Sequence, residues 1–428
     1  MMPTWSRNPW SIPLELWDMI ISHVDCENSL LDCALVCRTW RPAARQHRFN
    51  VVRITPQTNE REPRESPLLL SDPSSTILPY VRRIDLVEGV VPKSVVQFIP
   101  AIQSPSDAAQ YGGIAWLDDI LPTIRVHDLT ALQWLDLLEL CWEELSADSR
   151  ANLKYLCRRL TTLRHFTCSQ DNPARRCALA VELLDASPSL RTFTFHYHEA
   201  TPTGVATLAD DAQPLDLTPY YGMRRTAHPL TKLILSGHLG PIVTCLNIVH
   251  PNLRLEELSL AAISPDDEGT AISLLQSCAE TLTFLSLLYS KKSYEPMLCS
   301  GAGISRMIAL QTFTIMADLQ FVPAILRHIP SRSLKHLTMN AAPQTLSKTD
   351  LGDLTRVLTM GSLAASRPRV TIICWPEKVA QESEDPVALQ NMRDILVASL
   401  KDLHKDGRLE MLRVLYKDGC LSGTTEEF

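Results

Sequence analysis

Four residues near the start of the chain, His23, Cys26, Cys33 and Cys37, are of the types that bind zinc. Structural zinc sites take their thiolate and imidazole ligands from short, paired spacings. The spacing here matches no common ligand pair, and Cys33 and Cys37 fall within apolar stretches with helical periodicity. We therefore expect no metal site here and interpret these cysteines as buried thiols.

Two groups of adjacent carboxylates, Asp118-Asp119 and Asp266-Asp267-Glu268, are of the type used in acid–base catalysis. Neighbouring side chains point apart on a helix or a strand, so neither group forms a catalytic pair by itself. We expect Asp118 and Asp119 on the outer surface of a helix. The second group follows Pro265 and is expected at a helix N-terminus, where acids interact favourably with the dipole.

Other candidate ligand sites are His196 with His198, which share one face of a strand, and the segment Cys299-Ser-Gly-Ala-Gly303. The histidines have no evident third metal ligand, so we expect exposed polar residues. The glycine segment lacks the lysine and hydroxyl residue of a phosphate loop and indicates a turn. The sequence contains no G-x-S-x-G, P-loop, H-E-x-x-H or G-x-G-x-x-G motif. We expect no catalytic residue, no metal and no cofactor.

The composition is that of an ordinary globular protein, with 428 residues, 45% hydrophobic and 21% charged. The net charge of −7 provides no basic field for nucleic acid. No apolar run reaches the roughly 18 residues of a membrane span, and the N-terminus lacks a signal-peptide core. We expect a cytoplasmic or nuclear protein with reduced thiols, and neither nucleic acid nor membrane among its partners.

The N-terminal region consists of three short apolar stretches with helical periodicity. In the first, Leu14 to Val24, a narrow polar stripe leaves an apolar arc of roughly 220°. Two further apolar runs follow at 30–36 and 40–49. Helices this short cannot enclose so much apolar surface by themselves. Either the rest of the chain or another protein must cover the excess.

This region resembles an F-box, the three-helix module by which substrate receptors dock on the SKP adaptor of cullin–RING ubiquitin ligases. The resemblance rests on the order and spacing of Pro13, Leu16, Ile20, Val36, Cys37, Arg38 and Trp40, with Ile12 where the family often has leucine. The resemblance implies that the SKP-binding residues are Ile12, Pro13, Leu14, Leu16, Ile20, Ile21, Val24, Leu35, Val36, Cys37 and Trp40. We place the F-box at residues 11–54 and an exposed connection at 55–79.

From Tyr80 onward a six-residue pattern, L-x-x-L-x-L with aliphatic or aromatic substitutions, recurs along the chain. It begins at Val81, Leu132, Leu163, Leu190, Leu230, Leu255, Leu282, Leu310, Leu334 and, less clearly, Leu409. Between Leu230 and Leu334 the period is that of leucine-rich repeats, about 20 to 29 residues. Helical stretches are expected at 152–160, 178–186, 241–249, 269–278, 321–329, 350–360 and 387–404. Strands alternating with helices at this period predict a solenoid.

The predicted fold class is therefore α/β, a three-helix F-box followed by a curved solenoid with parallel strands on its concave face and helices outside. It is similar to the leucine-rich repeats that often follow an F-box. The asparagine or cysteine expected after each pattern is absent, so we expect irregular repeats. The repeats are placed at 80–375, a C-terminal helix and capping repeat at 376–418, and a tail at 419–428. The segment 196–229 is interpreted as a mostly disordered excursion.

The residues between and beside the inner leucines would line the concave face, because side chains alternate along a strand. Its middle row would be Asp136, Thr167, Thr194, Ile234, Ser259, Ser286, Thr314, Thr338 and Thr371. Candidate target-binding residues on this face are Trp134, Asp136, His165, His196, Lys232, Glu257, Phe284 and His336. Threonine and serine are also common on exposed strands that bind nothing.

These observations favour a non-catalytic substrate-recognition subunit of an SCF-type (SKP–cullin–F-box) ubiquitin ligase. Its partners would be an SKP-family adaptor, through it a cullin–RING ligase, and an unknown target protein. The alternative is a leucine-rich-repeat interaction scaffold that takes no part in ubiquitination. A metal-dependent enzyme is a weaker alternative, which metal analysis of the purified chain would test.

Overall fold

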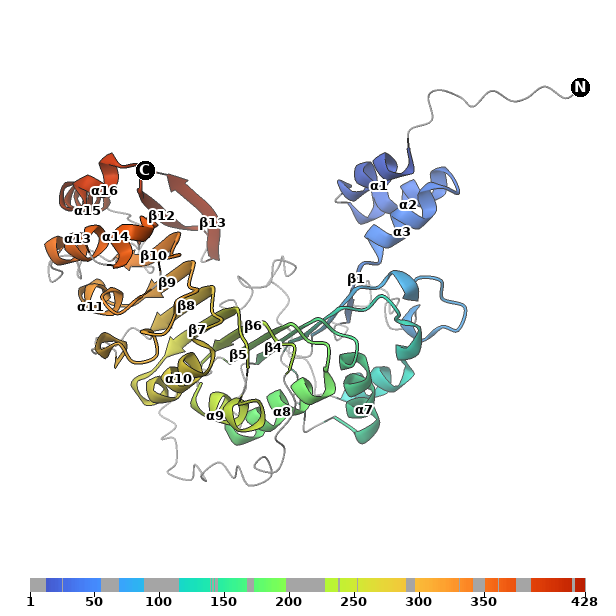
Figure 1. The fold of residues 1–428 in the computed structure, drawn as a ribbon. Helices are drawn as coiled ribbons and strands as arrows, with labels where there is room; N and C mark the ends of the chain where they lie inside the picture. Colours follow the sequence, from blue (N-terminus) through green and yellow to red (C-terminus); the bar gives the residue numbers. More distant parts are fainter. Residues whose placement is uncertain are drawn as a thin grey trace, which may run out of the picture. The chain divides into compact units, whose positions relative to one another are not determined.

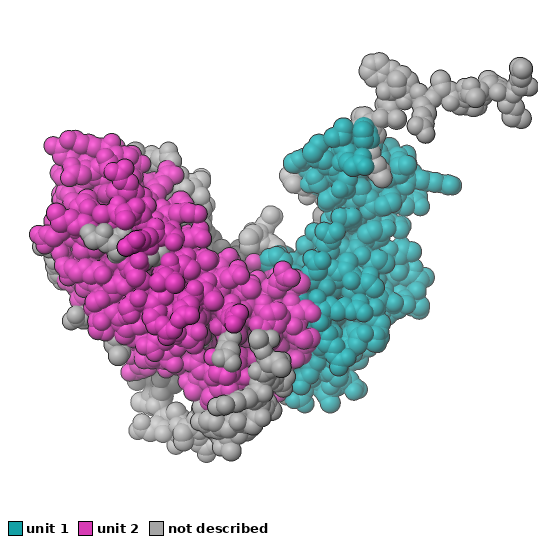
Figure 2. All heavy atoms as spheres, viewed as in Figure 1, with its two compact units in different colours: residues 1–89, 109–160 teal, residues 90–108, 161–428 magenta. Residues whose placement is uncertain are grey.

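The computed structural model of the chain divides into two compact units (Figure 2). The first unit comprises Met1–Gly89 and Ala109–Leu160, and the second comprises Val90–Ala108 and Thr161–Phe428. The structure describes residues 13–24, 26–54, 69–87, 115–138, 140, 142, 145–167, 173–197, 228–237, 239–251, 253–289, 297–330, 332–341, 351–360, 362–374, 386–417 and 420–427. Most of the predicted excursion at 196–229 lies outside these residues.

The first unit begins with a helical module made of α1 (Leu14–Ser22), α2 (Glu27–Val36) and α3 (Trp40–Arg48). Pro13 precedes α1, and its carbonyl accepts hydrogen bonds from the amides of Leu16 and Trp17. The module has a small core of Ile21, Leu30 and Ala44, with Val24, Cys33, Ala34, Trp40 and Ala43 packed around it. Most of the remaining apolar surface of α1 and α2 is left outside this core.

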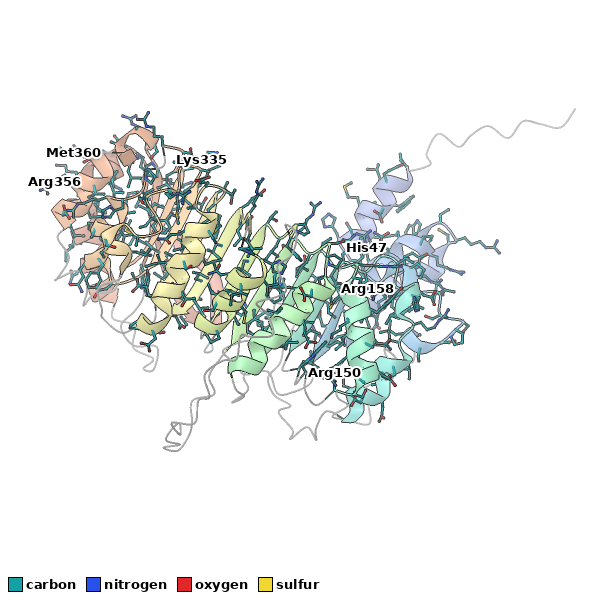
Figure 3. The ribbon with its side chains drawn as sticks, turned by 60° about the horizontal axis from the view of Figure 1, so that its bottom comes forward. His47, Arg150, Arg158, Lys335, Arg356 and Met360 are labelled. Atoms are coloured by element: carbon teal, nitrogen blue, oxygen red, sulfur yellow. The ribbon has the colours of Figure 1, made fainter. Side chains whose placement is uncertain are left out.

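Aromatic and polar contacts hold α1 against α3. The rings of Trp17 and Trp40 lie 4.5 Å apart between centroids. His47, on α3 (Figure 3), places its Nε2 atom 3.3 Å from Oδ1 of Asp18 on α1. These contacts supplement the small core of the module in holding α1 against α3.

The first unit continues with the parallel strands β1 (Val51–Ile54), β2 (Arg83–Val87) and β3 (Trp134–Leu138). Its other elements are η1 (Leu78–Tyr80), α6 (Ala115–Ile120), η2 (Leu121–Thr123), η3 (Val126–Asp128) and α7 (Ala147–Cys157). Ile84 and Leu135, which share one register position with Val52, are fully buried. Residues 51–54, expected at the end of the F-box, therefore form a strand of the sheet.

In the second unit, strands β4 to β12 pair in parallel and in the order of the sequence (Figure 1). The strands are β4 (Thr162–Thr167), β5 (Thr192–Tyr197), β6 (Lys232–Ser236), β7 (Glu257–Ile263), β8 (Phe284–Tyr289), β9 (Thr312–Met316), β10 (His336–Ala341), β11 (Arg369–Cys374) and β12 (Leu409–Lys417). β13 (Cys420–Glu427) pairs antiparallel with β12, so the expected tail at 419–428 is wrong. In β13 the backbone amides and carbonyls form hydrogen bonds with β12, whereas those of an unpaired tail would form hydrogen bonds with water.

Helices of the second unit line one face of this sheet (Figure 1). They are α8 (Pro173–Ala186), α9 (Gly240–Val249), α10 (Pro265–Cys278), α11 (Val322–Leu326), α13 (Leu351–Thr359), α14 (Ser362–Ser366), α15 (Pro386–Ser399) and α16 (Lys401–Lys405), with the short η6 (Met297–Ser300) and η7 (Leu319–Phe321). The prediction of three helices followed by an α/β solenoid of parallel strands is confirmed.

The inner positions of the repeated pattern form the core of the second unit. Leu258 pairs in register with Leu285, and Leu285 with Phe313, and all three are fully buried. The following inner positions, Leu260, Leu287 and Ile315, share the next register and are equally buried. The sequence pattern therefore predicted these core layers correctly.

The pattern was placed three residues too late in β4. Leu163, rather than Phe166, pairs with the core residue Phe193, and His165 pairs with Phe195. The His165 ring stacks on Phe195 with 5.1 Å between centroids and an interplanar angle of 10°. An imidazole therefore occupies a core position that the pattern reserves for an aliphatic side chain. Arg164 takes the middle-row position that had been given to Thr167.

The acidic residues of α10 and α6 lie where they were expected. Asp266, Asp267 and Glu268 form the first turn of α10, and Asp118 and Asp119 lie on α6. Asp267 Oδ2 accepts a hydrogen bond from the Ser264 hydroxyl at 2.7 Å. Its Oδ1 accepts the backbone amide of Gly240, the first residue of the preceding helix α9, also at 2.7 Å. One buried carboxylate thus serves the N-termini of two neighbouring helices.

The turn after η6 requires glycine at position 301. Gly301 has φ of +82°, and a Cβ added there would lie 2.7 Å from Nδ1 of His328. The Gly301→Ala variant is expected to lose about 2 to 3 kcal/mol of unfolding free energy, measured by urea titration. Gly269→Ala is the control, because a Cβ on Gly269 meets nothing within 4 Å and alanine favours the helix. Equal losses in the two variants would contradict this assignment.

The second unit contains a pair of adjacent histidines, His228 and His250, with ring centroids 5.3 Å apart. Burial lowers the pKa of His228 below its ordinary value of 6.5, and hydrogen bonds to the backbone of Leu184 and Ser187 partly oppose this. The unfolded chain therefore binds the proton more tightly than the folded chain. The resulting stability is present above pH 6.5 and is lost as the pH falls through the lowered folded-state pKa.

We expect the urea midpoint to decrease between pH 7 and pH 5, and to decrease less in a His228→Gln variant. A His127→Gln variant is the control, since His127 is exposed in the first unit. Identical pH slopes for the wild type and His228→Gln would contradict the role given to His228.

Candidate functional site

The helical module exposes apolar side chains on two of its helices. Leu16, Met19 and Ile20 follow helical spacing on α1, and Leu31 and Leu35 do so on α2, where Val36 follows. Leu35 is 79% exposed and Val36 is 62% exposed. We call the six residues Leu16, Met19, Ile20, Leu31, Leu35 and Val36 the docking surface. Exposed apolar residues gathered on short helices are typical of a protein-binding site.

The other residues expected to bind SKP have different positions. Ile21 is 1% exposed and belongs to the core of the module, and Val24 and Trp40 pack against that core. Ile21 therefore braces the helices from within, whereas Val24 and Trp40 are partly exposed at the edge of the core. Pro13 is exposed just before α1, Leu14 is the first residue of α1, and Ile12 lies outside the described residues.

Met19 and Leu31 belong to the docking surface and were absent from the residues expected to bind SKP. Met19 lies three residues after Leu16, and Leu31 lies four residues before Leu35. Because residues three or four apart share one face of a helix, this spacing alone would have identified both residues.

Cys26 and Cys37 are exposed at the two ends of α2, which corrects the expectation that they are buried. The Thr39 hydroxyl lies 2.9 Å from Cys37 Sγ and lowers the pKa of this thiol. Hydrogen bonds from the backbone and side chain of Ser29 lower the pKa of Cys26. Among the described residues, no three His, Cys, Asp or Glu side chains are grouped so that they could hold a metal ion.

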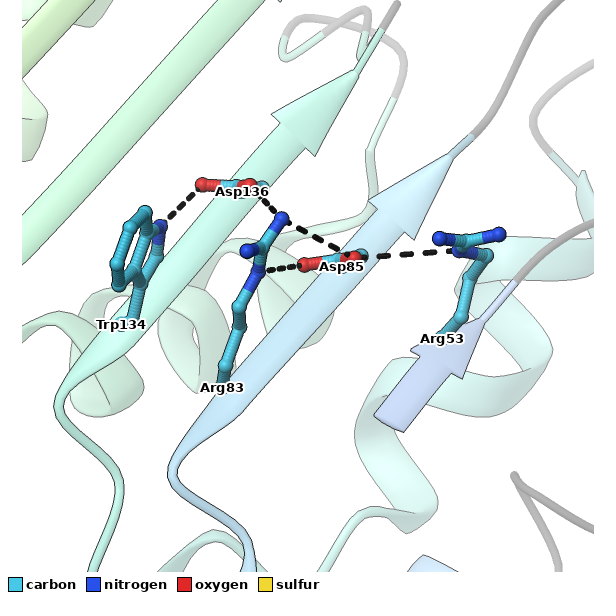
Figure 4. Close-up of polar contacts among 5 residues, drawn as sticks. All are labelled: Arg53, Arg83, Asp85, Trp134 and Asp136. Carbon is cyan, nitrogen blue, oxygen red and sulfur yellow. Dashed lines mark hydrogen bonds and ion pairs between the residues drawn. The ribbon is translucent and has the colours of Figure 1, made fainter. Parts of the chain in front are cut away.

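On β1 to β3, charged side chains form a linked group that we call the Arg83 network (Figure 4). Arg83 donates from Nε to Asp85 at 2.6 Å and from Nη2 to Asp136 at 2.7 Å. Arg53 Nε lies 3.9 Å from the other oxygen of Asp85. Both carboxylate side chains are only 1% exposed. The Arg83 guanidinium thus bonds to two buried acids that face each other in register, and Arg53 adds a longer ion pair to one of them.

The Arg83 network also contains Trp134 and therefore two of the residues expected to bind a target. The Trp134 indole donates from Nε1 to Asp136 at 2.5 Å, and the Arg83 guanidinium lies 4.8 Å from the centroid of its ring. Asp136 is fully buried, so its placement on an exposed face is wrong. The cause is local, because Arg83 and Trp134 lie on neighbouring strands and cover the carboxylate between them.

His165 is likewise not an exposed residue. It is 1% exposed and occupies the core position of β4 described above. His196 is partly exposed and stacks on Phe166 with 4.6 Å between ring centroids. Of the expected target-binding residues, those with exposed surface are therefore Trp134, His196, Lys232, Glu257, Phe284 and His336.

The exposed side of the second unit's sheet, opposite its helices, is called the strand face. The side chains of the strand face form three rows, because the strands pair in register. The front row is Lys232, Glu257, Phe284, Thr312, His336 and Arg369, the middle row is Ile234, Ser259, Ser286, Thr314, Thr338 and Thr371, and the back row includes Ser236, Ala261, Leu288 and Met316. From Ile234 onward the middle row is as expected from the sequence.

The comparisons with known proteins bear first on the helical module. A model of the F-box domain matches residues 10–51, which contain α1, α2 and α3. The module is an F-box domain. The docking surface therefore lies entirely within the F-box domain, and the match ends at Val51, the first residue of β1.

No curated protein sequence matches the chain. Among solved structures, the chain is similar to the leucine-rich repeat-containing protein LegL7 from Legionella pneumophila, with 12% identity and a TM-score of 0.36 over 88% of this chain and 92% of that one. It is also similar to a chain of the yeast Rad7 and Elc1 complex, with 12% identity and a TM-score of 0.36 over 87% of this chain and 91% of that one. In the described part of the chain, no helix has the length and apolar character needed to span a membrane.

Proposed function

We propose that this protein is a non-catalytic substrate-recognition subunit of an SCF-type ubiquitin ligase. Its F-box domain docks on an SKP-family adaptor, and its repeats bind a target protein. The observation that carries the proposal is the docking surface, whose large apolar side chains are exposed on an F-box domain. A partner that covers this surface would remove the apolar area from water.

The docking surface would supply a large part of the binding free energy of an interface. Full burial of one leucine or isoleucine side chain contributes about 1.5 to 3 kcal/mol. The six residues of the surface, which are already partly buried, would together contribute on the order of 6 to 10 kcal/mol by this measure. Association costs an estimated 4 to 15 kcal/mol, so neighbouring contacts such as Pro13 would be needed for tight binding.

The proposed mechanism is proximity. The repeats hold a target while other subunits bring the ubiquitin-charged enzyme, so the local concentration of the reactants increases. In this mechanism no side chain of the chain takes part in the chemical step. In this role the F-box domain would bind the adaptor and the strand face would bind the target.

Coexpression with an SKP-family adaptor, followed by affinity purification of the chain, tests the proposal. We expect the two proteins to co-purify in a fixed ratio through gel filtration. Co-purification that fails, or that survives Leu16→Asp combined with Ile20→Asp, would favour the interaction scaffold. An excess of metal over background in the purified chain would instead favour an enzyme.

Thiol labelling provides an independent test of the docking position. Cys37 directly follows Val36 of the docking surface, is exposed and has a lowered pKa, so it should react rapidly with iodoacetamide in the free chain. Bound adaptor should reduce the labelling rate of Cys37 by about tenfold or more. Cys278 is the internal control, because burial raises its pKa to about 12 and it should stay unlabelled in both states. Unchanged labelling of Cys37 in the complex would place the adaptor elsewhere.

A further inference from the structure

Two cations of the strand face, Lys232 and Arg369, are already paired with acids on the same face. Lys232 Nζ lies 2.6 Å from Glu257 Oε2 on the neighbouring strand. Arg369 Nε lies 3.2 Å from Glu410 Oε2, and Glu410 also accepts a hydrogen bond from the Thr371 hydroxyl. An incoming phosphate or carboxylate would have to displace Glu257 or Glu410 before it could pair with these cations.

Between the charged pairs, the middle row offers hydroxyl groups on consecutive strands. Ser259, Ser286, Thr314, Thr338 and Thr371 are all partly exposed and follow one another in register. Neighbouring strands are about 4.8 Å apart, so the hydroxyls form a regular line of donors and acceptors. Such a line suits uncharged amide and hydroxyl groups of a bound segment.

Beside the hydroxyl line lies an apolar patch centred on Leu288. Leu288 is 43% exposed on β8, and its register partners on either side are Ala261 and Met316. Phe284 lies on the same face of β8 and is partly exposed. A leucine this exposed in the middle of a sheet face is a candidate anchor point for an apolar side chain of a partner.

We propose that the strand face binds a protein segment that is uncharged where it lies on the face and that places an apolar side chain against Leu288. This inference rests on the proposed function and specifies the class of target. The charge pairs of the face disfavour phosphorylated or strongly acidic segments, since binding them would break Lys232–Glu257 or Arg369–Glu410. Recognition of the target would therefore not depend on its phosphorylation.

A selection of random peptides displayed on phage against the full chain tests the proposal. The enriched peptides should contain fewer Asp, Glu, Lys and Arg residues than the starting library. The dissociation constant of the most enriched peptide, measured by fluorescence polarisation, should change less than about twofold between about 0.05 and 0.5 M salt. Leu288→Asp should raise that constant by about tenfold or more, and Leu288→Ala should raise it in the same direction.

The matched control is Ile308→Asp, because Ile308 is 64% exposed in the turn between β8 and β9 and lies off the strand face. It should leave peptide binding unchanged, and circular dichroism should show the same melting temperature for all three variants. Three outcomes would each overturn the proposal. The enriched peptides could be charged and bind in a salt-sensitive way, no peptide could be enriched over a blank surface, or Leu288→Asp could leave the dissociation constant of the peptide unchanged. A dimer in light scattering that Leu288→Asp dissociates would show that a second copy of this chain occupies the face.

The same variants separate this inference from the ligase role. Leu288→Asp should still co-purify with the SKP-family adaptor while it loses the selected peptide. A wild-type chain that binds the uncharged peptide but never the adaptor would reject the ligase role and retain the strand-face assignment. A chain that binds the adaptor but selects only acidic peptides would retain the ligase role and reject the strand-face assignment.

Discussion

Leu35→Asp is expected to abolish co-purification with an SKP-family adaptor and to leave the fold intact. Leu35 is 79% exposed, so the substitution removes almost no packing within the free chain. In the complex it would lose about 1.5 to 3 kcal/mol of apolar burial. It would also bury an unpaired carboxylate, which costs several kcal/mol more. A loss of about 4 kcal/mol or more corresponds to a dissociation constant raised about a thousandfold.

Two controls make the result specific to the docking surface. Leu35→Lys should have the same effect, although a lysine in the last turn of α2 is favourable for the helix dipole. Ile308→Asp introduces the same charge at an exposed apolar residue of the second unit and should co-purify normally. Thermal melting of each variant establishes that it is folded. Normal adaptor binding by folded Leu35→Asp would remove the basis of the proposed docking.

Arg83→Met is expected to cause the largest loss of stability of any single substitution considered for this chain, about 3 to 5 kcal/mol. Arg83 neutralises Asp85 and Asp136, whose side chains are 1% exposed. Methionine keeps much of the side-chain volume but removes the guanidinium that bonds to both facing carboxylates, and it leaves Asp85 only the longer ion pair with Arg53. The urea midpoint of unfolding measures this loss.

The control for Arg83→Met is Arg306→Met. Arg306 pairs with Glu280 on the surface, where both side chains are more than half exposed, so its loss should cost less than about 1 kcal/mol. A triple variant that combines Arg83→Met with Asp85→Asn and Asp136→Asn should regain much of the lost stability. A cost for Arg83→Met no greater than that of Arg306→Met would show that the network contributes little.

The sequence was sufficient to predict the elements whose side chains follow a simple period. The spacing of leucines located the core layers at Leu258, Leu285 and Phe313, because every aliphatic residue of the pattern meets another in register. The helical spacing of Leu16, Ile20 and Leu35 likewise indicated apolar surface beyond what the module can enclose. These predictions depend on local periodicity, which a single sequence contains.

The errors arose where tertiary contacts change the role of a polar residue. His165 fills a core position because its ring stacks on Phe195, a contact with another repeat that the pattern does not encode. Asp136 is buried because Arg83, on a different strand, neutralises it. The final strand β13 was missed because its pairing with β12 is antiparallel, whereas the repeats predict only parallel strands.

The carboxylate of Asp267 has a consequence for how the repeats come apart. It holds the first amide of α9 and the cap of α10 together, and a Cβ on Gly240 would lie only 3.0 Å from its Oδ1. If α10 unravelled, α9 would lose the carboxylate that accepts its first amide, whereas the Ser264–Asp267 cap of α10 does not involve α9. Unfolding of α10 should therefore expose α9 to proteolysis as well.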